Sequence, residues 1–133
     1  MQAVEERRYG LRRKVSMSFD EANNRVRQTL KDQGFGVLTE IDVKSTLEQK
    51  LGVQGEPYLI LGACNPNLAH QALSEDPEVG LLLPCNVVVR QAGADVLVEA
   101  LDPAAAMGIV GNEAIEGVAG EARERLQKAL AAL

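Results

Sequence analysis

The run Tyr58-Leu-Ile-Leu-Gly-Ala-Cys64 restricts the possible folds of this chain more than any other segment. It is apolar, too short for a helix of its own, and bounded on both sides by turn-forming residues, so it predicts a buried central strand. Asn65 and Pro66 follow at once and predict the start of a helix, with Asn65 as its cap and Pro66 in its first turn. Cys64 is therefore predicted to lie where a strand passes directly into a helix.

Four further strands are predicted, at residues 11–17, 35–41, 85–91 and 96–101, with a hairpin loop between the last two. Short helices are predicted in the connections. Ser18 and Glu21 form a capping box before the first helix, and Asp42 caps another that ends at Gly52. Residues 81–83 are predicted to return to the core. This order of elements indicates an α+β fold, not a doubly wound α/β fold.

A long helix is predicted from about Asn112 to the end of the chain, because apolar residues recur along it as one continuous stripe. Gly117 and Gly120 lie inside this helix, where each glycine costs about 0.5 to 1 kcal/mol relative to alanine. We interpret the two glycines as positions where another backbone approaches closely.

The composition indicates one globular domain over residues 1–133, since 46% of the residues are hydrophobic and 25% are charged. The net charge of −5 disfavours nucleic acid as a partner, because the average field repels phosphate. Arg7, Arg8, Arg12, Arg13 and Lys14 form a local basic cluster. We interpret this cluster as the solvated polar face of the first strand, with an anion site as the alternative.

Several function classes find no support in the sequence. It contains no apolar signal segment and no apolar run of about 20 residues, so we expect a cytoplasmic protein with no membrane partner and with reduced cysteines. The glycines match no phosphate-binding loop, and the serines match no GxSxG motif of a serine hydrolase.

The runs FGVLTEID, YLILGACNP and GLLLPCNVVV, in this order and with helices between them, resemble the family called domain of unknown function 302. The most specific motifs are Gly62-x-x-Asn65-Pro66 and the Leu83-Pro84 that precedes the second cysteine. The resemblance covers nearly the whole chain. It implies a β-α-β4-α domain with a curved antiparallel sheet of about five strands, backed by its long helices and assembled as a homodimer. It implies no reaction.

The candidate site consists of Cys64, Asn65, Pro66, His70 and Cys85, which include both cysteines and the single histidine of the chain. A thiol directly before a helix start lies near free N–H groups and the positive end of the helix dipole. Such surroundings lower the pKa of a thiol and favour a nucleophile or a metal ligand. The opposing interpretation is that the cysteines pack as small hydrophobic side chains.

Three functions remain open at this site. The leading interpretation is a domain that binds a small molecule or a metal. Cys64, His70 and Cys85 would give zinc three ligands and an open fourth position, although the Cys-x5-His-x14-Cys spacing is not that of a zinc finger. The second is a redox protein that cycles a Cys64–Cys85 disulfide. The third is a structural homodimer without a site.

The direction of the two strands that carry the cysteines decides whether the thiols meet. The intervening helix at residues 66–75 suggests a parallel crossover, but Asp76-Pro77 and Gly80 provide a return turn. We therefore expect antiparallel strands, adjacent thiols, and His70 above the same edge of the sheet. For the homodimer, we expect contacts through the terminal helix and an exposed sheet edge.

Overall fold

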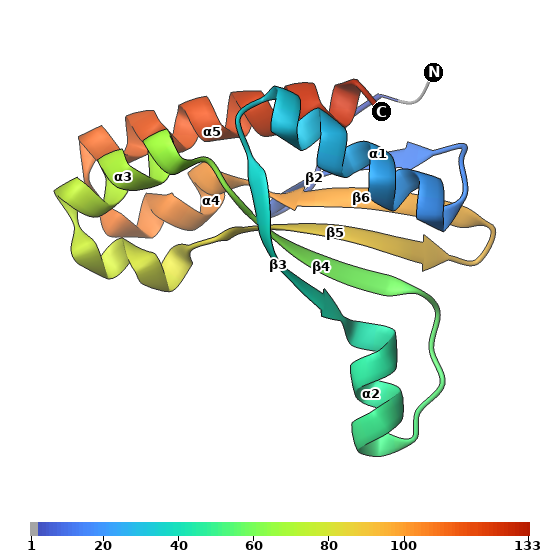
Figure 1. Cartoon of the computed structure of the whole chain (residues 1–133). Coiled ribbons are helices and arrows are strands. Elements are labelled where there is room, and N and C mark those ends of the chain that lie inside the picture. The colour runs from blue at the N-terminus through green and yellow to red at the C-terminus, as the bar shows by residue number, and fades with distance from the viewer. Residues whose placement is uncertain (1–2) are drawn as a thin grey trace.

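The computed structural model describes residues 3–133 and contains one six-stranded antiparallel sheet (Figure 1). The strands lie in the order β1-β2-β6-β5-β4-β3. Their bounds are Glu5–Glu6 (β1), Gly10–Val15 (β2), Gly36–Asp42 (β3), Tyr58–Cys64 (β4), Cys85–Ala92 (β5) and Asp95–Leu101 (β6). The predicted α+β class is confirmed, and the two-residue β1 brings the predicted five strands to six.

The helices lie in three places around the sheet (Figure 1). The long helices α1 (Phe19–Asp32) and α5 (Glu113–Ala131) cover one face. Near one end of the sheet lie α3 (Pro66–Glu75), α4 (Pro103–Met107) and the 3-10 helices Pro77–Leu82 (η1) and Gly108–Val110 (η2). Helix α2 (Val43–Leu51) stands apart from all of these, on the other side of the sheet.

The three predicted helix caps form. The Ser18 Oγ accepts a hydrogen bond from the Glu21 backbone N–H at 3.1 Å, and the Asp42 carboxylate accepts one from the Ser45 N–H at 2.9 Å. The Asn65 Oδ1 accepts a bond from the Leu68 N–H at 3.2 Å. Each cap satisfies a backbone donor that the first helical turn leaves without a partner.

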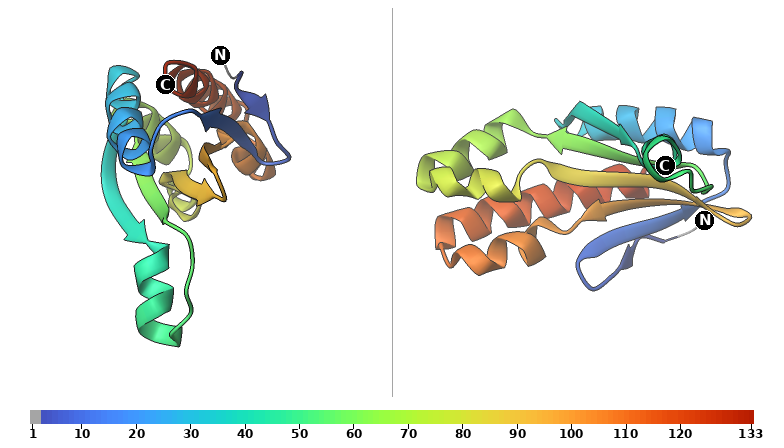
Figure 2. Two further views of the ribbon diagram at one scale, coloured as in Figure 1. Left: turned by 90° about the vertical axis from the view of Figure 1, so that its right-hand side faces the viewer. Right: turned by 90° about the horizontal axis from the view of Figure 1, so that it is seen from below.

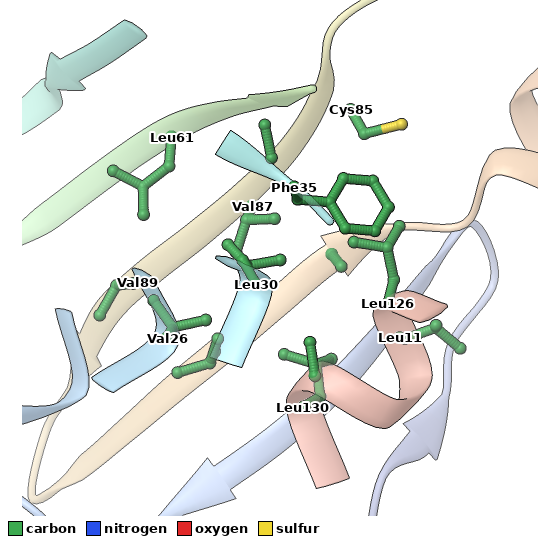
Figure 3. Close-up of a cluster of buried hydrophobic side chains, with 14 of the residues drawn as sticks. Leu11, Val26, Leu30, Phe35, Leu61, Cys85, Val87, Val89, Leu126 and Leu130 are labelled. Atoms are coloured by element: carbon green, nitrogen blue, oxygen red, sulfur yellow. The ribbon is translucent and has the colours of Figure 1, made fainter. Parts of the chain in front are cut away.

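The main core lies between the sheet and the two long helices (Figure 3). Inward-facing side chains of the central strands, such as Leu61 and Val87, pack with Leu30 of α1 and Leu126 of α5, and all four are fully buried. A second buried cluster lies between α3, η1, α4 and α5, and it consists of Ala72, Val79, Met107, Ile115 and Ala119. The apolar stripe of α5 therefore contributes to both clusters and is buried within the chain.

Arg13 differs from the rest of the predicted solvated cluster because it faces inward and is only 7% exposed. Its Nη1 donates hydrogen bonds to the backbone oxygens of Leu130 at 2.8 Å and Ala131 at 2.6 Å. These carbonyls belong to the last turn of α5, where a cation also meets the negative end of the helix dipole. Arg13 thus fastens α5 to β2 and is not part of a solvent-facing surface.

One further expectation holds only in part, and another does not hold. Leu82 and Leu83 pack against the second cluster as expected, but Leu81 is 88% exposed, because η1 turns this side chain outward while Val79 enters the cluster. Gly117 and Gly120 are exposed, and a Cβ built on either would meet no atom within 4 Å. No second backbone approaches them among the described residues, so a close approach does not explain these glycines.

Helix α2 projects away from the face of the sheet that α1 and α5 leave uncovered (Figure 2). None of its residues is buried. It begins at its Asp42 cap and ends at Gly52, whose φ of 69° suits the left-handed end of a helix. Within residues 3–133, no helix has the length and apolar character needed to cross a membrane.

Candidate functional site

Strands β4 and β5 pair in antiparallel fashion, as predicted, so the end of β4 and the start of β5 lie at the same edge of the sheet. In the register of this pair, Ala63 lies opposite Cys85. Cys64 is one position beyond, diagonal to Cys85 and not directly opposed to it. Since successive side chains of a strand alternate between its faces, regular strand geometry does not aim the two thiols at each other. Both cysteines are free.

A small cavity lies where this edge meets the helices. Its volume is about 40 Å³, and it is bounded by both cysteines and by residues of α3, α4 and α5. The residues that line the cavity come from both hydrophobic clusters, and the lining is almost entirely apolar. The larger lining residues are Phe35, Leu68, Leu83, Met107 and Val118. The cavity is thus a gap at the junction of the two clusters.

Cys85 lies in the wall of this cavity, at the end of the main core beside Phe35 (Figure 3). Burial, and to a smaller extent the nearby charge of Cys64, raises the pKa of its thiol from 9.0 to about 11. An apolar environment disfavours the thiolate because it removes the water that solvates the charge. Cys85 is therefore a protonated thiol at neutral pH.

Asn65 is placed by the cap that begins α3, and it is 8% exposed. Its backbone oxygen also accepts the Ala69 N–H at 2.9 Å, so Asn65 satisfies two backbone donors of the first turn. Pro66 occupies the first helical position, where the missing N–H costs nothing. These two residues shape the site, and Asn65 lines the cavity.

His70 does not join the cysteines. It is exposed and does not line the cavity, because the inward face of α3 carries Leu68 and Ala72, and His70 lies about 160° to 200° away from both around the helix. Across residues 3–133, no three His, Cys, Asp or Glu side chains are grouped so that they could hold a metal ion. The residues present therefore do not fit the zinc site that the sequence suggested.

Sequence reasoning missed Met107 and Val118 as cavity residues. Met107 belongs to α4 and Val118 to α5, far from the cysteines in the sequence. They line the same cavity as the thiols because α4 packs on α5 and α5 packs on α3. The apolar stripe of the terminal helix was visible in the sequence, and it included Val118. No local pattern indicated that this part of the stripe would border the two cysteines.

Comparison with known proteins decides the family. The family model described as "Domain of unknown function DUF302" matches residues 11–133. The chain belongs to this family. The DUF302 chain is also similar to a solved structure, that of the uncharacterized conserved protein DUF302 from Bacillus stearothermophilus. The two share 31% sequence identity with a TM-score of 0.88, over 94% of this chain and 98% of the other. No curated protein matches.

The two DUF302 motifs pack against each other in the structure. A Cβ on Gly62 would lie 2.2 Å from the Thr39 Oγ1 and 3.0 Å from the Pro84 Cγ, so the first motif needs a glycine where the proline of the second motif approaches. A Cβ on Gly34 would lie 2.9 Å from the Asn65 Nδ2. The residues of these motifs therefore determine how β3, β4 and the start of β5 pack together. None of the contacts described above involves a catalytic group.

Proposed function

We propose that this DUF302 domain binds a small molecule whose short apolar end enters the cavity between α3, α4 and α5. The observation that carries the proposal is the cavity, about 40 Å³ of space with an almost wholly apolar lining. Protein interiors are close-packed, and an apolar void stays dry because water finds no hydrogen-bond partners there. An apolar group that fills the void gains contacts without displacing well-bound water.

The volume limits the part of the ligand that enters. An apolar cavity of about 150 Å³ takes up benzene, so one of about 40 Å³ suits a branched or linear group of a few carbon atoms. The rest of the ligand would lie at the mouth, where Cys64 is half-buried. The ligand class is thus an amphipathic small molecule with a short aliphatic terminus.

The state of Cys85 supports binding over nucleophilic chemistry. The thiolate is the reactive form of cysteine, and a pKa of about 11 keeps that form rare at neutral pH. A protonated thiol behaves instead as a small polarizable apolar group in the cavity wall. In this proposal, Cys85 contacts the ligand and does not react with it.

Xenon and butan-1-ol are suitable probes, with methionine methyl groups labelled with ¹³C as the readout. Met107 lines the cavity, whereas Met17 packs against the main core. We expect both probes to shift the Met107 methyl resonance and to leave the Met17 resonance in place. Ala69→Leu, on the cavity wall, should abolish the shift by filling the space. Ala105→Leu, exposed on α4, is the matched control.

A Met107 resonance that does not move under saturating xenon would refute the proposed binding site. The same conclusion follows if Ala69→Leu leaves the shift unchanged, because the probe would then bind elsewhere.

A redox function is the second candidate, and one observation favours it. Cys64 and Cys85 line the same small cavity, and the charge of Cys64 contributes to the raised pKa of Cys85. In this function, the two thiols would react with a small disulfide such as oxidised glutathione. The products would be the Cys64–Cys85 disulfide and two molecules of reduced glutathione, which take up the two electrons and two protons that the protein loses. Mass spectrometry after this treatment tests it. A loss of about 2 Da favours the redox function, whereas no change or only mixed disulfides contradict it.

A further inference from the structure

The face of the sheet opposite α1 and α5 has no helix packed flat against it (Figures 1 and 2). A groove of about 640 Å³ runs over this face, within the range of about 300 to 1,000 Å³ that is usual for small-molecule sites. Eight of the thirteen residues that line it have polar side chains. The groove shares no residue with the cavity between α3, α4 and α5, so it is a separate candidate site.

A row of polar side chains crosses this groove from β2 to β4. The strand register places Arg12 directly opposite Glu99, and it places Arg90 directly opposite Tyr58. Glu99 and Arg90 lie on neighbouring strands and connect the two pairs through an ion pair of 2.5 Å. The row therefore spans four adjacent strands, a distance of about 14 Å at the usual spacing between strands.

Most of the charge in the groove is already compensated within the chain. Three of the four arginines that line it form ion pairs, Arg7 and Arg12 with Glu5 and Arg90 with Glu99. Arg8 forms none within residues 3–133, but it lies at the rim, on the loop before β2. The side chains of Arg12, Arg90 and Glu99 are only 25 to 28% exposed. The row thus offers an anion little free charge, and its paired groups are held in fixed positions.

These ion pairs leave hydrogen-bonding capacity unused. A guanidinium carries five N–H donors. Arg90 uses its Nε and Nη2 on Glu99, and Arg12 uses its Nη2 on Glu5. The Tyr58 hydroxyl and the Asn86 amide add groups that can both donate and accept. Fixed donors therefore lie beside fixed acceptors, a pattern that suits the hydroxyl groups of a ligand, since each hydroxyl also donates and accepts.

Both tyrosines of the chain line this groove, whereas its two phenylalanines pack in or against the main core. Tyr9 is 70% exposed, and Tyr58 is half-buried. A tyrosine combines a flat apolar ring with a polar hydroxyl, so it suits ligands that have an apolar surface and a polar edge. A sugar ring, with a face of C–H groups and hydroxyls around its edge, is such a ligand.

We propose that the groove on the open sheet face binds a short neutral oligosaccharide. One sugar ring stacks on Tyr58, and sugar hydroxyls bond to Arg90 and Glu99. The length of the row, about 14 Å, suits roughly two or three sugar rings. Charge complementarity favours a neutral polar ligand, because an anion would face the Glu99 carboxylate. An apolar ligand would remove water from the charged groups and give them no hydrogen bond in return.

NMR titration of the full chain, with the tyrosine rings and methionine methyl groups labelled with ¹³C, tests the proposal. The neutral probes are maltotriose, cellotriose and xylotriose, and the anionic probes are trigalacturonate and inorganic phosphate. We expect at least one neutral sugar to shift the Tyr58 ring resonance in a saturable way at millimolar concentrations. The Met107 methyl resonance should stay in place, because Met107 lines the other cavity. The result is therefore independent of the function proposed for that cavity.

Two variants test the contacts, with affinity measured by calorimetry. Tyr58→Ala should weaken the binding of the sugar at least tenfold, because it removes the stacking ring. Glu99→Gln should also weaken it, because the neutral amide is a weaker acceptor and no longer holds Arg90 in place. Glu48→Gln is the matched control, because Glu48 is exposed on α2 and does not line the groove. Circular dichroism and the melting temperature verify that the variants fold.

The proposal is overturned if none of the three neutral sugars moves the Tyr58 resonance at tens of millimolar. Tighter binding of phosphate or trigalacturonate than of any neutral sugar would also overturn it, because the groove would then be an anion site. The same conclusion follows if Tyr58→Ala leaves the affinity unchanged, or if Glu48→Gln weakens binding as much as Glu99→Gln does.

Discussion

Cys85 is expected to make the protein lose stability in alkaline solution. Its side chain is 8% exposed, and burial, together with the charge of Cys64, raises the pKa of its thiol from 9.0 to about 11. The folded protein therefore keeps the Cys85 proton over a pH range in which the unfolded chain has already released it. Raising the pH through this range draws molecules towards the unfolded state.

The size of the effect follows from the two pKa values. Each pH unit between them is worth about 1.4 kcal/mol, so the interval from 9.0 to about 11 corresponds to roughly 3 kcal/mol of unfolding free energy. This contribution is fully present below pH 9, is lost progressively up to about pH 11, and does not change further above that. The free energy of unfolding of a typical domain is only about 5 to 15 kcal/mol, so a loss of this size is measurable.

Urea unfolding of the wild type and of Cys85→Ala, under reducing conditions from pH 7 to pH 10.5, measures this contribution. Lysines and tyrosines titrate in both proteins, so the informative quantity is the difference between the two unfolding free energies. We expect this difference to be constant up to about pH 8.5. Above that pH, the wild type should lose about 1.4 kcal/mol per pH unit relative to the variant.

Two parallel stability curves over the whole pH range would refute the reasoning, because Cys85 would then titrate alike in the folded and unfolded states. The variant Cys64→Ser separates the two causes. It removes the charge of Cys64 but leaves the burial, so most of the alkaline loss should remain, since burial is the larger cause.

Four further single substitutions test how the fold is held together. Gly117→Ala and Gly120→Ala should each stabilise the protein by about 0.5 to 1 kcal/mol, because a Cβ meets nothing there; calorimetry showing a lower melting temperature would contradict this. Gly62→Ala should destabilise it by about 1 to 3 kcal/mol through the clash with Thr39, and adding Thr39→Ala should restore part of the loss, whereas no recovery would point to another cause. Asn65→Ala should cost about 1 kcal/mol in urea unfolding, and an unchanged midpoint would show that the cap is not needed.

Much of the local structure could be predicted because the interactions that form it are close in sequence. The cap at Ser18 bonds to an N–H three residues on, and the same is true of the caps at Asp42 and Asn65. A short apolar run bounded by turn residues likewise has few alternatives to a strand. The antiparallel direction of β4 and β5 also followed from the sequence, since Asp76-Pro77 and Gly80 indicated a return turn.

The sequence by itself determined the α+β class, the family and the junction at which Cys64 lies. The tertiary structure alone decided which side chains surround that junction. His70 was predicted near the cysteines from its spacing, but the packing of α3 turns it to solvent. Arg13 was predicted to be solvated, but α5 covers it. Burial, and with it the pKa of Cys85, depends on segments far apart in the chain, and local sequence patterns do not specify how those segments pack.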